Sequence, residues 1–560
     1  MPESSDLSHA ARADLVLRGG RVLPLPADPA TSAPEGASLA VRDGRILGVS
    51  ARADAFDALI GAQTRVVDAR GLTVIPGFFD SHNHQLSTAH NLDAVQLAKA
   101  RSIADILKAI GEAAAAAQPG DWIRCSPTWH ETLLAERRLP RADELDRVAP
   151  RNPVYLPRGG HVVVTNSEGL RRAGLRAEQA DPPGGSLIRD ASGRLTGTLL
   201  EPPAFAPLIA LLPEPDQKER VEQLARGCAL YNARGITAVR DPGINRDELA
   251  VYQRCEQAGR LSVRSIVMLR MEPSWPLEQK IDALKTWPTP NGSAGLLRAG
   301  GVKLWLDGGV EAAALESPYA NDPSFTGHLF EQPQSLVTVV EAALARGLDV
   351  GCHAVGEKAI DAAIQAYDAV LRRDPSVDPR RLVVEHASLA NPRHIEALRR
   401  LGLTVTVQFP LLYFLAGNML VYWGEERTER TKPLRDLVDG GVFLAAGSDS
   451  PVNPFDPLLA LWGAVSRQTA VAGRRGVDQA LTRLEALRLG TTAGARLWTG
   501  PHRRDGLLPG RLADITALPL DPLTCELDAL PESPVALTVT GGRVVHDPEG
   551  RTTRSDGRRG

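Results

Sequence analysis

The stretch Val74-Ile-Pro-Gly-Phe-Phe-Asp-Ser-His-Asn-His84 decides how the rest of this chain is interpreted, because an apolar run in it ends in two histidines one residue apart. If the run is a β-strand, His82 and His84 point to the same side, since side chains alternate between the two faces of a strand. Two imidazoles side by side at a strand end form half of a divalent-metal site. Such a pair also arises by chance or on a solvated loop, so a metal site requires further ligands elsewhere in the chain.

Length and composition predict a soluble globular protein with a large core. The 560 residues exceed an ordinary single domain, although a barrel with insertions can take up most of them. Hydrophobic residues make up 43% of the chain and charged residues 23%. The net charge of −3 and the pI near 6.5 argue against a nucleic-acid partner, which usually meets a basic surface. We therefore expect a small-molecule substrate.

Cysteine usage and targeting signals predict a cytoplasmic location. The five cysteines are scattered and without a Cys-x-x-Cys motif, which suits a reducing compartment and excludes a disulfide framework. The polar N-terminus shows no signal peptide. Residues 403–423 are apolar enough to raise the question of a membrane span, but polar residues, a proline and a glycine interrupt them. We expect a buried strand followed by an apolar loop there, and no membrane partner.

Short β-branched runs alternate with Ala/Leu/Arg-rich stretches along the middle of the chain, which is typical of a parallel α/β fold. Eight parallel strands with intervening helices are what a TIM barrel requires. The sequence offers eight candidate strands: 72–80, 236–241, 262–269, 302–307, 349–353, 382–386, 403–408 and 442–449.

The two ends of the chain share a strand, Gly-Gly turn, strand pattern and are expected to form one small β-sandwich. Far more chain separates the first two candidate barrel strands than one crossover helix needs, so a subdomain must be inserted there, over the barrel mouth as a lid. The expected boundaries are 11–72 with 500–548 for the sandwich, 73–499 for the barrel, 97–203 for the inserted subdomain and 549–560 for a disordered tail.

Barrel enzymes carry their chemistry at the C-terminal ends of the strands. In this chain those ends present His82, His84, Lys303, Asp307, His353, His386 and Asp449. Each has an ordinary structural alternative, such as a hydrogen-bonded buried histidine or, for Asp449, a helix N-cap. Their occurrence together at five strand ends favours a metal centre.

Lys303 is the most discriminating of these residues. A lysine inside Gly300-Gly-Val-Lys-Leu-Trp-Leu-Asp-Gly308 should point into the barrel, where burial disfavours the ammonium and lowers its pKa. A neutral amine can react with carbon dioxide to give a carbamate, an anionic ligand able to bridge two metals. The structural alternative is an internal ion pair with Asp307.

With these residues the chain resembles the amidohydrolase superfamily, and within it the amidohydrolase family 3 branch that includes N-substituted formamide deformylase. The resemblance covers nearly the whole chain and is carried by these segments: Ala13-Asp-Leu-Val-Leu-Arg-Gly-Gly20, Pro76-Gly-Phe-Phe-Asp-Ser-His-Asn-His84, Gly160-His161, Asn166-Ser167, Asp181-Pro-Pro-Gly-Gly185, Thr196-Gly-Thr-Leu-Leu-Glu201, Gly235-Ile-Thr-Ala-Val-Arg-Asp241, Lys303-Leu-Trp-Leu-Asp-Gly308, His353-Ala-Val-Gly356, Glu385-His386, Gly447-Ser-Asp449 and Leu512-Ala-Asp-Ile-Thr516.

The resemblance implies a binuclear site, usually zinc, and a homodimer. His82 and His84 would hold the more buried metal with Asp449 on the same side. The second metal would be held by His353 and His386, and a carboxylated Lys303 would bridge the two.

It also implies contacts with a substrate. The histidine matching His161 points from the insertion toward the substrate in this branch, and Trp129, Asp307 and Gln408 are the other candidates for substrate binding. The chain departs from the family pattern at Asp307-Gly-Gly309, where Asp-Gly-Ser is usual, and at Ser126-Pro-Thr-Trp129, where Gly-x-Gly-Trp is common. Both departures concern the shape of the pocket.

The expected function is hydrolysis of a non-peptide C–N bond, formamide-like, by a metal-activated hydroxide with Asp449 as general base and then acid. His161 would act beside it as a second catalytic residue. Cyclic amide or lactam hydrolysis, deamination, and hydrolysis at phosphorus or an ester remain alternatives on the same barrel. A non-catalytic scaffold is a further alternative, but it should lack several ligands, and this chain lacks none.

Overall fold

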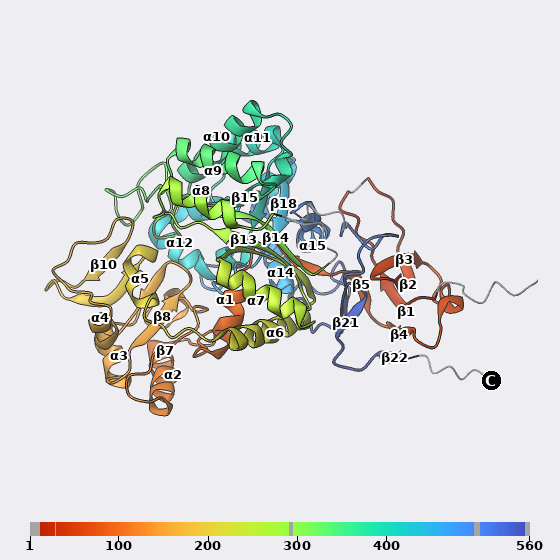
Figure 1. Cartoon of the computed structure of the whole chain (residues 1–560), viewed down its shortest axis with the longest axis horizontal. Coiled ribbons are helices and arrows are strands. Elements are labelled where there is room, and N and C mark those ends of the chain that lie inside the picture. Colours follow the sequence, from red (N-terminus) through yellow and green to blue (C-terminus); the bar gives the residue numbers. More distant parts are fainter. Residues whose placement is uncertain (1–11, 29, 290–294, 498–503, 555–560) are drawn as a thin grey trace, which may run out of the picture.

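The computed structural model describes residues 12–28, 30–289, 295–497 and 504–554. It has three parts: a central barrel, a sheet built from both ends of the chain, and an inserted segment (Figure 1). In Figure 1 the terminal sheet lies on the right and the inserted segment on the left, so they flank the barrel at opposite ends of the molecule. The arrangement confirms the predicted fold.

The barrel consists of eight parallel strands in sequence order. Its inner strands are buried along their whole length, as expected of parallel strands covered on both faces. Backbone hydrogen bonds from Ser81 to Ala446 (3.0 Å) and from Asp449 to His82 (2.8 Å) link the first and last strands. The strands are β6 (Phe78–Asp80), β12 (Ile236–Ile244), β13 (Arg264–Arg270), β14 (Leu297–Trp305), β15 (Asp349–Ala354), β16 (Leu382–His386), β17 (Thr404–Val407) and β18 (Phe443–Ala446).

Helices cover the outside of the barrel between successive strands. Several begin at an Asp, Asn or Thr whose side chain accepts a backbone N–H of the first turn, as in helix α7, which Asn245 caps. The helices are α6 (Gln217–Ala233), α7 (Arg246–Gln257), α8 (Leu277–Thr286), α9 (Pro333–Ala345), α10 (Glu357–Arg373), α11 (Pro392–Leu401), α12 (Phe409–Arg430), α13 (Leu434–Asp439), α14 (Pro457–Ser466) and α15 (Arg483–Leu489).

The segment expected to form the first barrel strand, 72–80, is two strands in two different sheets. β5 (Thr73–Pro76) pairs with strands of the terminal sheet, and only β6 pairs with barrel strand β12. Gly77 stands between them, where a Cβ atom would lie 2.3 Å from the Oγ1 atom of Thr237. The chain passes from one sheet to the other at a point where no side chain fits, so this position requires glycine.

Both ends of the chain contribute to one nine-stranded sheet. We expected residues 549–560 to be disordered, but Thr552–Arg554 pair with β4, so that part of the prediction is wrong. Residues 555–560 lie outside the described residues, as do 498–503 at the expected junction with the barrel. The strands are β1 (Leu15–Val22), β2 (Gly36–Arg42), β3 (Arg45–Ser50), β4 (Arg65–Asp68), β5, β19 (Ile515–Leu518), β20 (Leu537–Thr540), β21 (Arg543–His546) and β22 (Thr552–Arg554).

The inserted segment, between β6 and β12, forms a five-stranded sheet with its own helices and its own apolar core. Its strands are β7 (Ile123–Arg124), β8 (Val154–Arg158), β9 (Val162–Val164), β10 (Ser186–Arg189) and β11 (Leu195–Leu200). The helices of this part of the chain are α1 (Gln85–His90), α2 (Ile103–Ala116), α3 (Ala142–Val148), α4 (Ser167–Arg172) and α5 (Pro202–Ile209).

The apolar loop expected after β17 is a helix. Residues 409–430 form α12, with a proline in its first turn and a non-helical glycine, Gly424, inside it. Leucine, alanine and methionine favour helix, and Pro410 is tolerated because its missing N–H would have no partner in the first turn. Within the described residues, no helix is long and apolar enough to cross a membrane.

Candidate metal centre and active site

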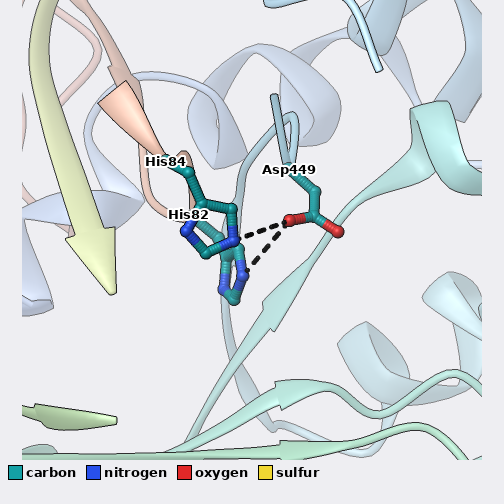
Figure 2. Close-up of side chains that lie close together, drawn as sticks. All are labelled: His82, His84 and Asp449. Atoms are coloured by element: carbon teal, nitrogen blue, oxygen red, sulfur yellow. Dashed lines mark ion pairs between the residues drawn. The ribbon is translucent and has the colours of Figure 1, made fainter. Parts of the chain in front are cut away.

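His82, His84 and Asp449 converge at one point at the C-terminal mouth of the barrel. His82 and His84 both direct Nε2 toward Oδ1 of Asp449, at 3.5 and 3.4 Å (Figure 2). Their ligand atoms all lie within 4.8 Å of one another. The two histidines follow β6 and Asp449 follows β18, so closure of the barrel brings them together.

The spacing of these atoms fits a shared cation. At metal–ligand distances of about 2.1 Å, two donors in tetrahedral positions lie about 3.4 Å apart. The observed separations from Asp449 Oδ1 match this value. Burial would raise the pKa of Asp449, but the hydrogen bond from His84 and the charges of His82, His84 and Lys303 outweigh it and hold the pKa at about 2. Asp449 is therefore an anion at neutral pH.

Glu385 fixes the orientation of His82. Its Oε2 atom lies 2.8 Å from Nδ1 of His82, and its Oε1 atom accepts a 2.6 Å hydrogen bond from Arg240. Thr406 donates a further hydrogen bond to Oε2. Burial alone would raise the pKa of Glu385, but Arg240 and His82 keep it well below its usual value. A carboxylate on Nδ1 keeps the proton there, which leaves the lone pair of Nε2 free for a metal.

Glu385 and Arg240 were not predicted as site residues, although Glu385 is adjacent to His386 and Arg240 to Asp241. Side chains of neighbouring residues in a strand point to opposite faces. If His386 points into the barrel, this rule predicts that Glu385 points outward, away from the site. The alternation ends because His386 has a φ of 73°. Both side chains therefore serve the same site, Glu385 through His82 and His386 directly.

His353 and His386 lie next to this cluster but outside the three-residue group. The ring centroids of His82 and His386 are 4.6 Å apart, and those of His353 and His386 are 4.5 Å apart. Nδ1 of His386 lies 2.7 Å from the amide oxygen of Gln408, so the proton belongs on Nδ1 and Nε2 is free. Burial lowers the pKa of both histidines well below the usual value, which makes them neutral donors.

Lys303 is fully buried, and its Nζ atom has no hydrogen-bond partner within the described residues. Burial lowers its pKa to about 8, although Glu385 and Asp449 oppose that shift. Among the described residues Lys303 forms no ion pair with Asp307, and its Nζ atom lies 5.0 Å from the centroid of the Trp305 ring. An unpartnered buried amine beside neutral imidazoles and a carboxylate fits a divalent-metal centre.

A pocket opens from these residues and spans about 560 Å³, part of which is open to solvent. Its wall combines the metal-site residues His353, His386 and Asp449 with residues of the inserted segment and of α12. The inserted segment therefore contributes to the wall of the pocket, and its role as a lid over the barrel mouth stays a prediction.

His161 lines this pocket from the inserted segment. Its Nδ1 atom lies 2.7 Å from Oε2 of Glu201, a residue with an unusual φ of 64°. Burial would lower the pKa of His161, but Glu201 outweighs it by charge and hydrogen bonding, and the pKa rises to about 9. His161 is thus a cation at neutral pH, as expected of a residue that steadies a developing negative charge. Glu201 was not predicted.

Three residues expected to contact substrate make hydrogen bonds within the protein and are not among the residues that line the pocket. Trp129 is buried and donates to the carbonyl of Pro157 (2.7 Å). Asp307 is fully buried and accepts backbone N–H groups of Ala314, Val355 and Gly356, which secures two loops at the barrel mouth. Gln408 is buried and orients His386. These hydrogen bonds lie within the protein, and contact of the three residues with a substrate stays a prediction.

Comparisons with known proteins identify the family of this chain. The chain is 29% identical over 507 residues to N-substituted formamide deformylase of Arthrobacter pascens, covering 87% of this chain and 92% of the relative. It is 31% identical over 527 residues to the protein LONG AFTER FAR-RED 3 of Arabidopsis thaliana, covering 90% and 87%. An uncharacterized metal-dependent hydrolase from Pyrococcus horikoshii OT3 superposes with a TM-score of 0.72 at 25% identity, covering 92% of this chain and 99% of that chain. The sequence profile of the amidohydrolase family matches residues 65–546, and the chain belongs to that family.

Proposed function

We propose that this protein is a metal-dependent hydrolase of a non-peptide C–N bond, acting on a small formamide-like amide. The observation that carries the proposal is the convergence of His82, His84 and Asp449 at the mouth of the barrel, beside the unpartnered amine of Lys303. The similarity to a formamide deformylase along most of both chains supports the choice of bond.

Six residues would hold two zinc ions: His82, His84 and Asp449 for one, His353 and His386 for the other, and a carboxylated Lys303 for both. When bound, such metals lower the pKa of water and polarise a carbonyl group. Carbamate formation needs a neutral amine, and burial favours that form at Lys303 by lowering its pKa to about 8.

Asp449 would move the proton. Its ionised carboxylate lies at the pocket wall, which supports a role in accepting a proton from water and returning it to the leaving nitrogen. His161, held as a cation by Glu201, would stabilise negative charge on the carbonyl oxygen.

The test is a hydrolysis panel of N-formyl amines, N-acyl amino acids, lactams and carbamates with the zinc-loaded protein. Asp449→Asn should lower turnover about a hundred- to ten-thousandfold, the range for loss of a general acid–base, without unfolding the protein. Asp439→Asn, an exposed carboxylate on α13, is the matched control and should leave turnover unchanged. Full activity of the Asp449→Asn protein would contradict the assigned role, and preferred turnover of lactams would move the assignment to cyclic amides.

A further inference from the structure

His130 is a buried histidine on the pocket wall whose two ring nitrogens have no hydrogen-bond partner within the described residues. It is 2% exposed and comes from the inserted segment, outside the metal site. The ring of Phe414, on α12, stacks against it at a centroid distance of 5.8 Å, which fixes the plane of the imidazole. A buried polar group without a partner costs free energy, so a ligand that supplies one gains affinity.

The charges beside His130 are already paired. Arg158 contacts Glu131 at 2.9 Å and Glu311 at 2.6 Å, and all three side chains are largely buried. Asn418 donates to Glu131 at 2.6 Å. Two carboxylates around one guanidinium leave an excess of negative charge on this wall, and the other cation of the wall, His161, is paired with Glu201.

His130 adds no positive charge to this wall. Burial and the nearby Arg158 lower its pKa to about 3, so at neutral pH it is a neutral ring with one donor and one acceptor. Such a ring matches a hydroxyl or amide group, which also donates and accepts. A carboxylate would lose its hydration without meeting an unpaired cation on the described part of this wall.

The rest of this side of the pocket is apolar. α12 contributes Leu411, Leu415, Met419 and Trp423, and the barrel loops add three valines. Trp423 is held by a 2.8 Å hydrogen bond from Nε1 to the carbonyl of Val310, so its ring edge is fixed. This surface suits the hydrocarbon or aromatic body of a substrate.

We propose that His130 is a specificity-determining residue, and that with the Arg158–Glu131–Glu311 cluster it selects uncharged amides whose apolar body carries a hydroxyl or amide group, and rejects N-acyl amino acids. The inference rests on the proposed hydrolysis and names its substrate class. The reaction cleaves the amide at the metal site, whereas His130 contacts the hydroxyl or amide group carried by the body of the same molecule.

Three matched compounds test the subsite: N-formylphenylalaninol, N-formyl-2-phenylethylamine and N-formylphenylalanine. They share a formamide and a benzyl group and differ in carrying a hydroxyl, no group or a carboxylate. Binding is measured by calorimetry with the full-length, zinc-loaded protein in an Asp449→Asn background. We expect the alcohol to bind about tenfold more tightly than the unsubstituted amide, the effect of one good hydrogen bond, and the carboxylate to bind at least about tenfold more weakly than the alcohol.

Variants separate recognition from structure. His130→Leu should reduce the preference for the alcohol to less than about twofold, and His130→Gln, which keeps a donor and an acceptor, should restore most of it. Glu311→Gln, which removes one carboxylate from Arg158, should narrow the discrimination against the carboxylate. His546→Leu, in β21 of the terminal sheet, is the control and should leave the preferences unchanged.

The inference is overturned if the carboxylate binds as tightly as the alcohol, if none of the three compounds binds, or if His130→Leu weakens all three equally. Turnover by the protein with Asp449 intact is recorded separately. Binding in the expected order without turnover of any compound would count against the proposed formamide hydrolysis and not against the subsite.

Discussion

His82 lies between two carboxylates that act on different nitrogens of its ring. Glu385 holds Nδ1, while Nε2 is directed at Asp449. The imidazole is thereby fixed in the tautomer that can bind a metal before any metal arrives. The tautomer of His82 is thus set by its immediate partners alone. Gln408 sets the tautomer of His386 in the same way, through Nδ1.

Replacement of Glu385 by glutamine should weaken metal binding about 10- to 100-fold, because the amide holds His82 less firmly and adds no negative charge. Competition of the purified protein with a zinc chelator measures the effect. Glu357→Gln, an equally buried glutamate on α10, is the control and should retain normal affinity. An unchanged affinity in a folded Glu385→Gln protein would show that Glu385 has no part in positioning the ligand.

The ligands themselves could be predicted from the sequence, because each ends an apolar strand and strand ends meet at one mouth of a barrel. Glu201 and His130 could not. Glu201 follows β11 and meets His161 beside the paired strand β9, and His130 stacks on Phe414 of α12. These contacts join segments that are far apart in the sequence. Neither the spacing of the residues nor their polarity predicts which segments meet.

At the level of elements, the barrel strands were predicted nearly at their observed positions, whereas the first strand and α12 were not. The run from 72 to 80 has the same apolar character whether it forms one strand or two, and the division depends on the close approach of Gly77 to Thr237. α12 buries residues on more than one side, so its apolar residues show no clear helical stripe.

Gly77→Ala should destabilise the protein by about 1–3 kcal/mol, the cost of forcing an extra methyl group into a packed site. The added Cβ would lie 2.3 Å from Oγ1 of Thr237, so β6 must shift. Thermal unfolding midpoints measure the loss. Gly490→Ala is the control, because the nearest atom to its Cβ would be 3.8 Å away. Equal midpoints for the two variants would show that the crossing at Gly77 is not tightly packed.

At the scale of the whole molecule, the terminal sheet is attached to the barrel by a buried ionic cluster. Asp514, which precedes β19, lies 2.8 Å from Arg264 of β13 and 2.7 Å from Arg504. Arg504 also donates to Thr237 of β12. Burial would raise the pKa of Asp514, but the two arginines outweigh it and lower the pKa to about 2.

Asp514→Asn should lower the free energy of unfolding by about 3–5 kcal/mol near neutral pH, because it leaves two buried arginines without their counter-ion. Since the pKa of Asp514 is lower in the folded state, its contribution is complete above about pH 4 and is lost as the pH falls toward 2. The difference in free energy of unfolding between the wild type and Asp514→Asn should therefore decrease by about 2 kcal/mol between pH 4 and pH 2.

Unfolding midpoints of the wild type and of Asp514→Asn, recorded between pH 7 and pH 2, measure this prediction. Asp54→Asn is the control, because Asp54 pairs with Arg52 on the exposed surface of the terminal sheet, where an ion pair contributes little. A difference between wild type and Asp514→Asn that is independent of pH would contradict the assigned role of the carboxylate.

The metal content of the purified protein tests the central claim most directly. Protein expressed with added zinc and dialysed against metal-free buffer is analysed by inductively coupled plasma mass spectrometry, beside a His82→Ala/His84→Ala variant of verified fold. We predict about one to two equivalents of divalent metal per wild-type chain, with loss of at least about one equivalent in the variant. A folded wild-type protein that retains no metal, or a variant that retains as much as the wild type, would contradict the account.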